Sequence, residues 1–138
     1  MENLKIEYID DFTILVNKQI VKASPLSTWR SIFFVDEYVI KLDINESEQC
    51  TNEIDLFEKI KGTDEEKYFV PILEYGESCG VHYIIQKRLR LRKSKVHTEE
   101  LEDTLDHLQN KFGLWDLCDR NFTLQRGQVL IFDYGSYC

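Results

Sequence analysis

The sequence predicts one α+β domain: an N-terminal antiparallel β-sheet that carries one helix, followed by a helix and a β-hairpin. Three observations predict this class. The chain has 138 residues, which fits a single domain. Hydrophobic residues make up 43% and charged residues 30%, as in globular chains. Runs of β-branched and aromatic residues outnumber the segments with helical spacing. The β-rich half is expected at about 1–86 and the smaller half at about 96–138.

Strands are predicted for most of the first half. Residues 4–16 alternate loosely between polar and apolar side chains, which indicates one or two short strands. Two β-rich runs, 31–35 and 38–42, flank Asp36-Glu37 and predict a hairpin. The other predicted strands of this half are an irregular one over 68–76 and one over 81–86, with a turn at 78–80 between them.

Two helices are predicted. Residues 45–47 offer N-cap chemistry for a helix over about 47–61, and Gly62 is expected to end it. A second helix is expected over about 98–111, with Gly113 as its stop. Apolar residues recur at helical spacing in both, at Cys50, Ile54, Phe57 and Ile60 and then at Leu101, Leu105 and Leu108. A hairpin with strands over 122–124 and 129–132 is expected to follow.

Composition excludes several classes of protein. No run approaches the roughly 18 apolar residues of a membrane span, and the polar N-terminus has no signal-peptide core. A net charge of -8 and a pI near 4.9 argue against general nucleic-acid binding. The cysteines, Cys50, Cys79, Cys118 and Cys138, form no C-x-x-C pair and complete no metal-ligand spacing with histidine. We therefore expect reduced thiols and a cytoplasmic protein.

Three polar residues near the C-terminal hairpin have a spacing that suits phosphoryl transfer. Asp116 and Asn121 are five residues apart, and Asp133 follows twelve residues after Asn121, at the end of an apolar strand. Transfer of a phosphoryl group to an alcohol needs a base or orienting group for the hydroxyl and oxygen ligands for Mg²⁺. Each residue alone also has a simpler explanation as a turn or cap residue.

These residues resemble the motifs of the protein-kinase-like family. The segment from Asp116 to Asn121 is similar to the catalytic loop, and Asp133-Tyr134-Gly135 is similar to the D-F-G element, with tyrosine in the aromatic position. The loop is closer to the small-molecule, bacterial or phage branch than to eukaryotic protein kinases. The resemblance implies a kinase-like fold with a much reduced C-terminal half.

The resemblance extends upstream and implies a nucleotide site. Val39-Ile40-Lys41 is similar to the strand that carries the phosphate-binding lysine. Glu53 is the expected ion-pair partner of Lys41, with Glu48 and Glu58 as less well placed alternatives. Residues 83–88 resemble the strand and hinge on which an adenine would lie, and this implies Gln86 and Lys87 as further nucleotide contacts.

The sequence departs from the family pattern in three places. The segment 22–30 occupies the place of the glycine-rich phosphate loop without one glycine, so Ser27 and Thr28 are the expected donors there. Leu114 stands where the family usually has histidine. The sequence ends at Cys138, so we expect no activation segment and no substrate-binding helices, and we expect any acceptor to be small, the protein itself, or docked elsewhere.

The resemblance implies a set of roles. Lys41 contacts the phosphates of ATP, Glu53 holds Lys41, Asp116 orients or deprotonates an acceptor hydroxyl, and Asn121 and Asp133 bind Mg²⁺. The alternative is an inactive, pseudokinase-like binding module that sequesters or regulates a protein partner, for example a phage protein acting on a host factor in the host cytoplasm.

One segment is strongly basic although the chain as a whole is acidic. Six of its 17 basic residues fall within nine positions, namely Lys87, Arg88, Arg90, Arg92, Lys93 and Lys95. The simpler interpretation is a solvated linker between the two halves. The functional alternative is a docking surface for an anionic protein partner or a nucleotide phosphate.

Overall fold

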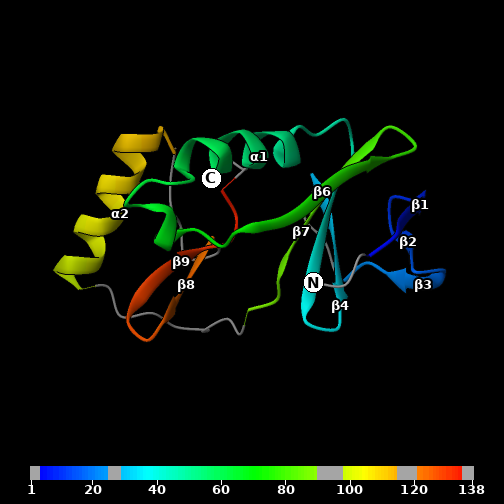
Figure 1. The fold of residues 1–138 in the computed structure, drawn as a ribbon, viewed down its shortest axis with the longest axis horizontal. Coiled ribbons are helices and arrows are strands. Elements are labelled where there is room, and N and C mark those ends of the chain that lie inside the picture. The colour runs from blue at the N-terminus through cyan, green and yellow to red at the C-terminus, as the bar shows by residue number, and fades with distance from the viewer. Residues whose placement is uncertain (1–3, 25–28, 90–97, 115–120, 135–138) are drawn as a thin grey trace. The chain divides into compact units, whose positions relative to one another are not determined.

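The computed structural model contains two compact units, which are described one at a time (Figure 1). The first unit comprises residues 1–51 and 72–88, and the second comprises 52–71 and 89–138. The boundary falls inside helix α1 (Gln49–Ile60), so most of this helix belongs to the second unit. The residues that the structure describes are 4–24, 29–89, 98–114 and 121–134.

A three-stranded antiparallel sheet begins the first unit. Its strands follow the chain order, and their bounds are β1 (Ile6–Asp10), β2 (Thr13–Val16) and β3 (Gln19–Lys22). The strands predicted over 4–16 are β1 and β2. Strand β3 was not predicted, because it is only four residues long and mostly exposed, so it carries no alternation of buried and exposed positions.

A four-stranded antiparallel sheet forms the rest of the first unit, in the order β4-β5-β7-β6. The strands are β4 (Arg30–Val35), β5 (Tyr38–Asp43), β6 (Ile72–Ser78) and β7 (Val81–Lys87). The predicted hairpin is confirmed as β4 and β5, joined by a turn in which Asp36 has φ of 51°. The strand predicted from residue 68 begins only at Ile72, after Pro71, which has no N–H to donate to a ladder.

The core of the first unit lies on one face of the four-stranded sheet. Its buried members are Leu4, Ile6, Ile14, Val16, Phe33, Ile40, Leu42 and Ile85. They come from both sheets of the unit, so the core joins the two sheets. Burial of one such side chain contributes about 1.5–3 kcal/mol, so this cluster contributes to the stability of the unit.

The N-terminus of helix α1 is capped by two side chains. The Gln49 N–H donates to Ser47 Oγ at 3.1 Å, and the Cys50 N–H donates to Asp43 Oδ1 at 3.1 Å. Gly62, with φ of 84°, follows the helix as predicted. The buried positions of α1 are Cys50, Glu53, Phe57 and Ile60. The buried face of α1 therefore includes Glu53 in place of the predicted Ile54.

The second unit contains the 3-10 helix η1 (Glu66–Tyr68), helix α2 (Glu99–Phe112) and a hairpin of β8 (Phe122–Gln125) and β9 (Gln128–Ile131). The Leu101 N–H donates to the Oγ1 of Thr98, the N-cap of α2, at 3.1 Å. Gly113 ends α2 in the left-handed conformation, with φ of 68°. The predicted leucine stripe of α2 is buried, at Leu101, Leu105 and Leu108.

The segment after η1 joins the β8–β9 hairpin. Phe69 forms a parallel bridge with Ile131, and the Val70 N–H donates to the Ile131 carbonyl at 2.9 Å. The ring of Phe69 also makes an edge contact with the ring of Phe112, at 5.8 Å between centroids. These contacts tie η1, α2 and the hairpin into one unit. Over the described ranges, no helix has both the length and the apolar character that a membrane crossing requires.

Candidate functional site

Two of the predicted nucleotide contacts lie on the same face of the four-stranded sheet. Lys41 of β5 is opposite Ile84 of β7, and Val39 is opposite Gln86. Because side chains two residues apart share a face, Lys41 and Gln86 both point away from the core face that carries Ile40. Lys41 is 5% exposed and Gln86 is fully buried. The structure therefore brings these two predicted residues together.

Two more charged residues share this face with Lys41. Arg30 and Asp43 are opposite each other in the β4–β5 register, and both are buried. The Cys50 thiol donates to the Lys41 carbonyl at 3.4 Å, and its sulfur lies 4.0 Å from Arg30 Nη1. Burial raises the pKa of the Asp43 carboxyl, while the hydrogen bond from the Cys50 N–H acts to lower it.

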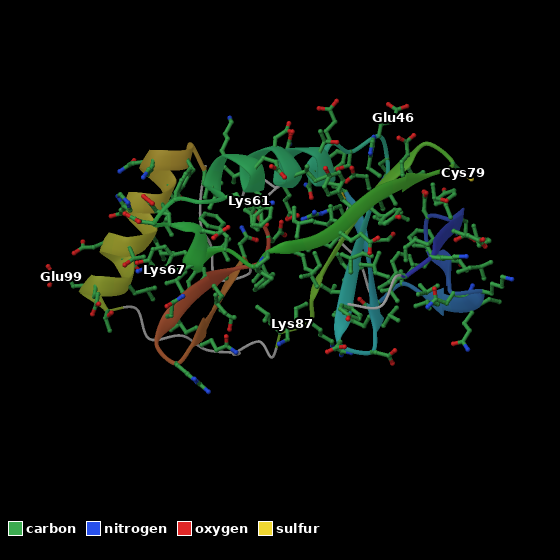
Figure 2. The ribbon with its side chains drawn as sticks, viewed as in Figure 1. Glu46, Lys61, Lys67, Cys79, Lys87 and Glu99 are labelled. Atoms are coloured by element: carbon green, nitrogen blue, oxygen red, sulfur yellow. The ribbon has the colours of Figure 1, made fainter. Side chains whose placement is uncertain are left out.

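Lys87 does not share the face of Gln86. It is the last residue of β7, lies opposite Tyr38 and is exposed (Figure 2). Its neighbour Arg88 places its guanidinium 4.3 Å from the ring centre of Phe34, and its N–H donates to the Glu37 carbonyl at 2.7 Å. The start of the basic run is therefore held by the β4–β5 hairpin. The predicted docking residues from Arg90 to Lys95 lie outside the described residues.

The two predicted metal ligands are joined through their backbones in the second unit. The Asn121 carbonyl accepts hydrogen bonds from the Phe132 N–H at 3.0 Å and the Asp133 N–H at 3.2 Å. Asn121 is 5% exposed and precedes β8, and Asp133 follows β9. The hairpin therefore brings the residues at its two ends together.

Glu53 lies beside the same backbone segment. Its Oε1 accepts a hydrogen bond from the Tyr134 N–H at 3.2 Å, and its side chain is fully buried. The alternatives Glu48 and Glu58 are exposed. Lys41 belongs to the first unit and Glu53 to the second, so their ion pair stays a prediction.

Asn121 and Asp133 are chemically suited to Mg²⁺. Mg²⁺ prefers oxygen ligands, and proteins usually hold it with one or two carboxylates while water and phosphate oxygens supply the rest. An amide oxygen and a carboxylate from residues whose backbones are hydrogen-bonded fit this pattern. Within the described residues, no group of three or more histidine, cysteine, aspartate and glutamate side chains is placed to hold a metal.

Three predicted site residues lie outside the described residues, namely Ser27, Thr28 and Asp116. The roles assigned to them, as phosphate donors and as the group that orients the acceptor hydroxyl, stay predictions.

The structure also shows an anchor that was missed in the sequence. The Tyr134 hydroxyl donates to the Val70 carbonyl at 2.9 Å, and Tyr134 is 4% exposed. The sequence contained a sign of this contact. Tyrosine stands where the family motif has phenylalanine, and its hydroxyl is a hydrogen-bond donor that phenylalanine lacks. Its acceptor could not be identified from the sequence, since Val70 is 64 residues away.

Comparison with protein-family models and with curated proteins finds no match. Solved structures do match. WbdD in complex with the kinase inhibitor LY294002 superposes with a TM-score of 0.59 and 18% identity over 93% of this chain. A structure described as the bifunctional kinase-methyltransferase WbdD gives 0.54 and 18% over 93%. The Legionella pneumophila Lpg2603 kinase bound to IP6 gives 0.53 and 12% over 100%.

These matches identify the class of fold. The chain has a protein-kinase-like fold of the mixed α+β class, and its described residues form antiparallel sheets and two α-helices. The identities are low, so the likeness extends to the fold alone. The chain spans 35% and 37% of the two WbdD chains and 61% of the Lpg2603 chain.

Proposed function

We propose that this chain binds ATP with Mg²⁺ and transfers the γ-phosphate to a hydroxyl acceptor. The observation that carries the proposal is a set of hydrogen bonds that connects the backbone at Asp133 to Asn121 and Glu53. The Asn121 carbonyl accepts from the Asp133 N–H, and the Glu53 carboxylate accepts from the N–H of the next residue, Tyr134. By their resemblance to the kinase motifs, we assign Asn121 and Asp133 as metal ligands and Glu53 as the glutamate that partners the phosphate-binding lysine.

The first unit supports the nucleotide part of the proposal. Lys41 is a buried cation on the same sheet face as Gln86, the residue proposed to contact the adenine. A lysine ammonium is a point charge of the kind that binds phosphate groups, so Lys41 suits the phosphates of a nucleotide. The carbonyl of Lys41 is fixed by the Cys50 thiol, which restrains the backbone from which the side chain extends.

The proposed reaction assigns one task to each residue. Asp116 accepts the proton of the acceptor hydroxyl as its oxygen forms a bond to the γ-phosphorus. The bond from the γ-phosphorus to the β–γ bridging oxygen breaks, and ADP leaves with that electron pair. Lys41 would bind the phosphates, and Asn121 and Asp133 would hold Mg²⁺ with their side-chain oxygens. When bound, Mg²⁺ neutralises charge on the phosphate oxygens.

The test measures ATP binding by calorimetry with and without Mg²⁺, and ³²P transfer from labelled ATP. The unmodified chain should bind ATP in a Mg²⁺-dependent way, and Asp133→Ala should weaken binding by at least about tenfold, the loss expected for a charged ligand. Asp116→Ala should keep binding but lose transfer. Absence of ATP binding by the unmodified chain would overturn the proposal.

Matched controls separate these effects from general loss of structure. Asp106→Ala makes the same change as Asp133→Ala on the exposed face of α2. Lys41→Ala should also weaken ATP binding, and Lys61→Ala makes the same change at an exposed lysine just after α1 (Figure 2). Both controls should bind ATP as the unmodified chain does.

A second candidate function is a binding module with the same fold and no transfer activity. The observation that favours it is the segment 22–30, which contains no glycine where a kinase carries its phosphate loop. Side chains there hinder close approach of the backbone to phosphate. Such a module could regulate or sequester a protein, as a phage protein acting on a host factor would. ATP binding without transfer to any acceptor, the protein itself included, would favour this candidate.

A further inference from the structure

We infer that Tyr134 is a positioning residue whose hydroxyl holds the segment that carries Asp133 in its place. The inference deepens the proposed function, because it concerns how the predicted metal ligand is kept in position, and its metal readout rests on that function. It is carried by the side-chain contacts of Tyr134 within the second unit.

The Tyr134 side chain is fixed at both its ring and its hydroxyl. The ring makes an edge contact with the ring of Phe69, with centroids 5.2 Å apart and planes at 87°. The hydroxyl donates to the carbonyl of Val70 at 2.9 Å. Both partners belong to the segment that follows η1, so one tyrosine spans from the end of the hairpin to this segment.

The anchoring segment is itself tied to the hairpin. The Val70 N–H donates to the Ile131 carbonyl at 2.9 Å, two residues before Asp133. Val70 therefore contacts the chain on both sides of Asp133, through its N–H before it and through its carbonyl after it. A closed loop of this kind restricts the backbone torsions of the residues that it encloses.

Two further hydrogen bonds hold the backbone of the same residues. The Asn121 carbonyl accepts from the Asp133 N–H, and Glu53 accepts from the Tyr134 N–H. These contacts fix the backbone. If the hydroxyl is removed, the Tyr134 ring keeps its contact with Phe69 and loses the hydrogen bond to Val70. The hydroxyl is the atom that phenylalanine, the usual residue of the motif, does not have.

The experiment compares the unmodified chain with Tyr134→Phe, which keeps the ring and its contact with Phe69 and removes only the donor. The control is Tyr75→Phe, the same change at a tyrosine that is 55% exposed. The first measurement is amide hydrogen exchange of Phe132, Asp133 and Tyr134 without nucleotide. Exchange at these amides should become about 3- to 10-fold faster in Tyr134→Phe, the factor expected for one hydrogen bond, and stay unchanged in Tyr75→Phe.

The second measurement is the Mg²⁺ concentration that half-saturates ATP binding. It should rise about 3- to 10-fold in Tyr134→Phe, while ATP binding without Mg²⁺ stays the same. A hydroxyl with a merely structural role would lower the melting temperature without moving this Mg²⁺ dependence.

The outcomes separate this inference from the proposed function. Unchanged amide exchange in Tyr134→Phe overturns the inference, and so does faster exchange with an unchanged Mg²⁺ dependence. If the unmodified chain binds no ATP, the proposed function fails, and the exchange measurement alone decides whether Tyr134 positions the segment. Faster exchange confined to residues 132–134 then supports the inference.

Discussion

Asp43 is a buried carboxyl that also caps a helix, and these two properties shift its pKa in opposite directions. Its Oδ1 accepts from the Cys50 N–H, which favours the ionised form. Burial favours the neutral form and has the larger effect, so the pKa is raised. A carboxyl whose folded pKa lies above its unfolded value stabilises the protein at acidic pH, and this contribution is lost as the pH rises through the folded pKa.

We therefore expect Asp43→Asn to be as stable as the unmodified chain at pH 7, or more stable. Asparagine keeps an oxygen acceptor for the Cys50 N–H and carries no charge to bury. Asp43→Ala should lose about 1 kcal/mol, because the cap is gone. Urea unfolding at pH 7 and pH 4 measures both variants. A larger loss for Asp43→Asn than for Asp43→Ala would contradict this account.

Glu65 shows the opposite pKa shift. Its carboxylate is paired with the Lys111 ammonium, and His107 Nε2 lies 3.6 Å from the same oxygen. The hydrogen bond from Lys111 is the largest cause of the lowered pKa of Glu65. A carboxyl with a lowered folded pKa stabilises the protein above its unfolded pKa, and this contribution disappears as the pH falls through the folded pKa.

Glu65→Gln should thus lower the melting temperature at pH 7 and have progressively less effect below about pH 4.5, the ordinary pKa of a glutamate. Glu58→Gln, the same change at an exposed position of α1, should have little effect at either pH. Melting curves from pH 7 to pH 3 test this. A Glu65→Gln effect that does not change with pH would contradict the ion-pair explanation.

At the scale of elements, helix boundaries in this chain are set by short polar side chains and glycines. Helix α1 uses two acceptors, Ser47 and Asp43, the second contributed by strand β5. Helix α2 uses Thr98 at its start and Gly113 at its end. Such groups satisfy backbone donors and acceptors that a helix leaves unpaired at its ends.

Thr98→Ala should therefore destabilise the chain by about 1 kcal/mol, since the Leu101 N–H loses its acceptor. Thr104→Ala is the matched control within the same helix. Its hydroxyl donates to the Glu100 carbonyl, which already belongs to the helix, and alanine has the higher helix propensity. Chemical denaturation should show a loss for Thr98→Ala alone. Equal losses for the two variants would rule out the capping explanation.

At the scale of the whole molecule, the predicted site residues are divided between the two units. Lys41 and Gln86 belong to the first unit, and Glu53, Asn121 and Asp133 belong to the second. A ligand that binds the folded chain stabilises it by mass action, because the unfolded chain does not bind that ligand.

ATP with Mg²⁺ should accordingly raise the melting temperature. At a ligand concentration of 100 times Kd, the added stability is about 2.7 kcal/mol. The increase should be smaller with ATP and EDTA, and Asp133→Ala should abolish the difference between the two conditions. Scanning calorimetry with ATP, with and without Mg²⁺, checks this. An equal increase in Asp133→Ala and in the unmodified chain would argue against Asp133 as a metal ligand.

Local patterns were sufficient to predict most of the elements. The leucine stripe and Gly113 predicted α2, and runs of β-branched and aromatic residues predicted β5 and β7. They were not sufficient for β3, which is short and exposed, nor for the start of β6 after Pro71. The motif order predicted a kinase-like fold, which the structural comparisons confirm. The metal and nucleotide roles of the site residues stay predictions.

The sequence by itself therefore determined the fold class and most of the succession of strands and helices, because periodicity, caps and turns act between residues close along the chain. Only the tertiary structure decided that most of α1 belongs to the second unit, and that Glu53 accepts from Tyr134 and Tyr134 donates to Val70. These hydrogen bonds join residues 81 and 64 positions apart. No local pattern encodes such partners, because they meet only when the core brings distant segments together.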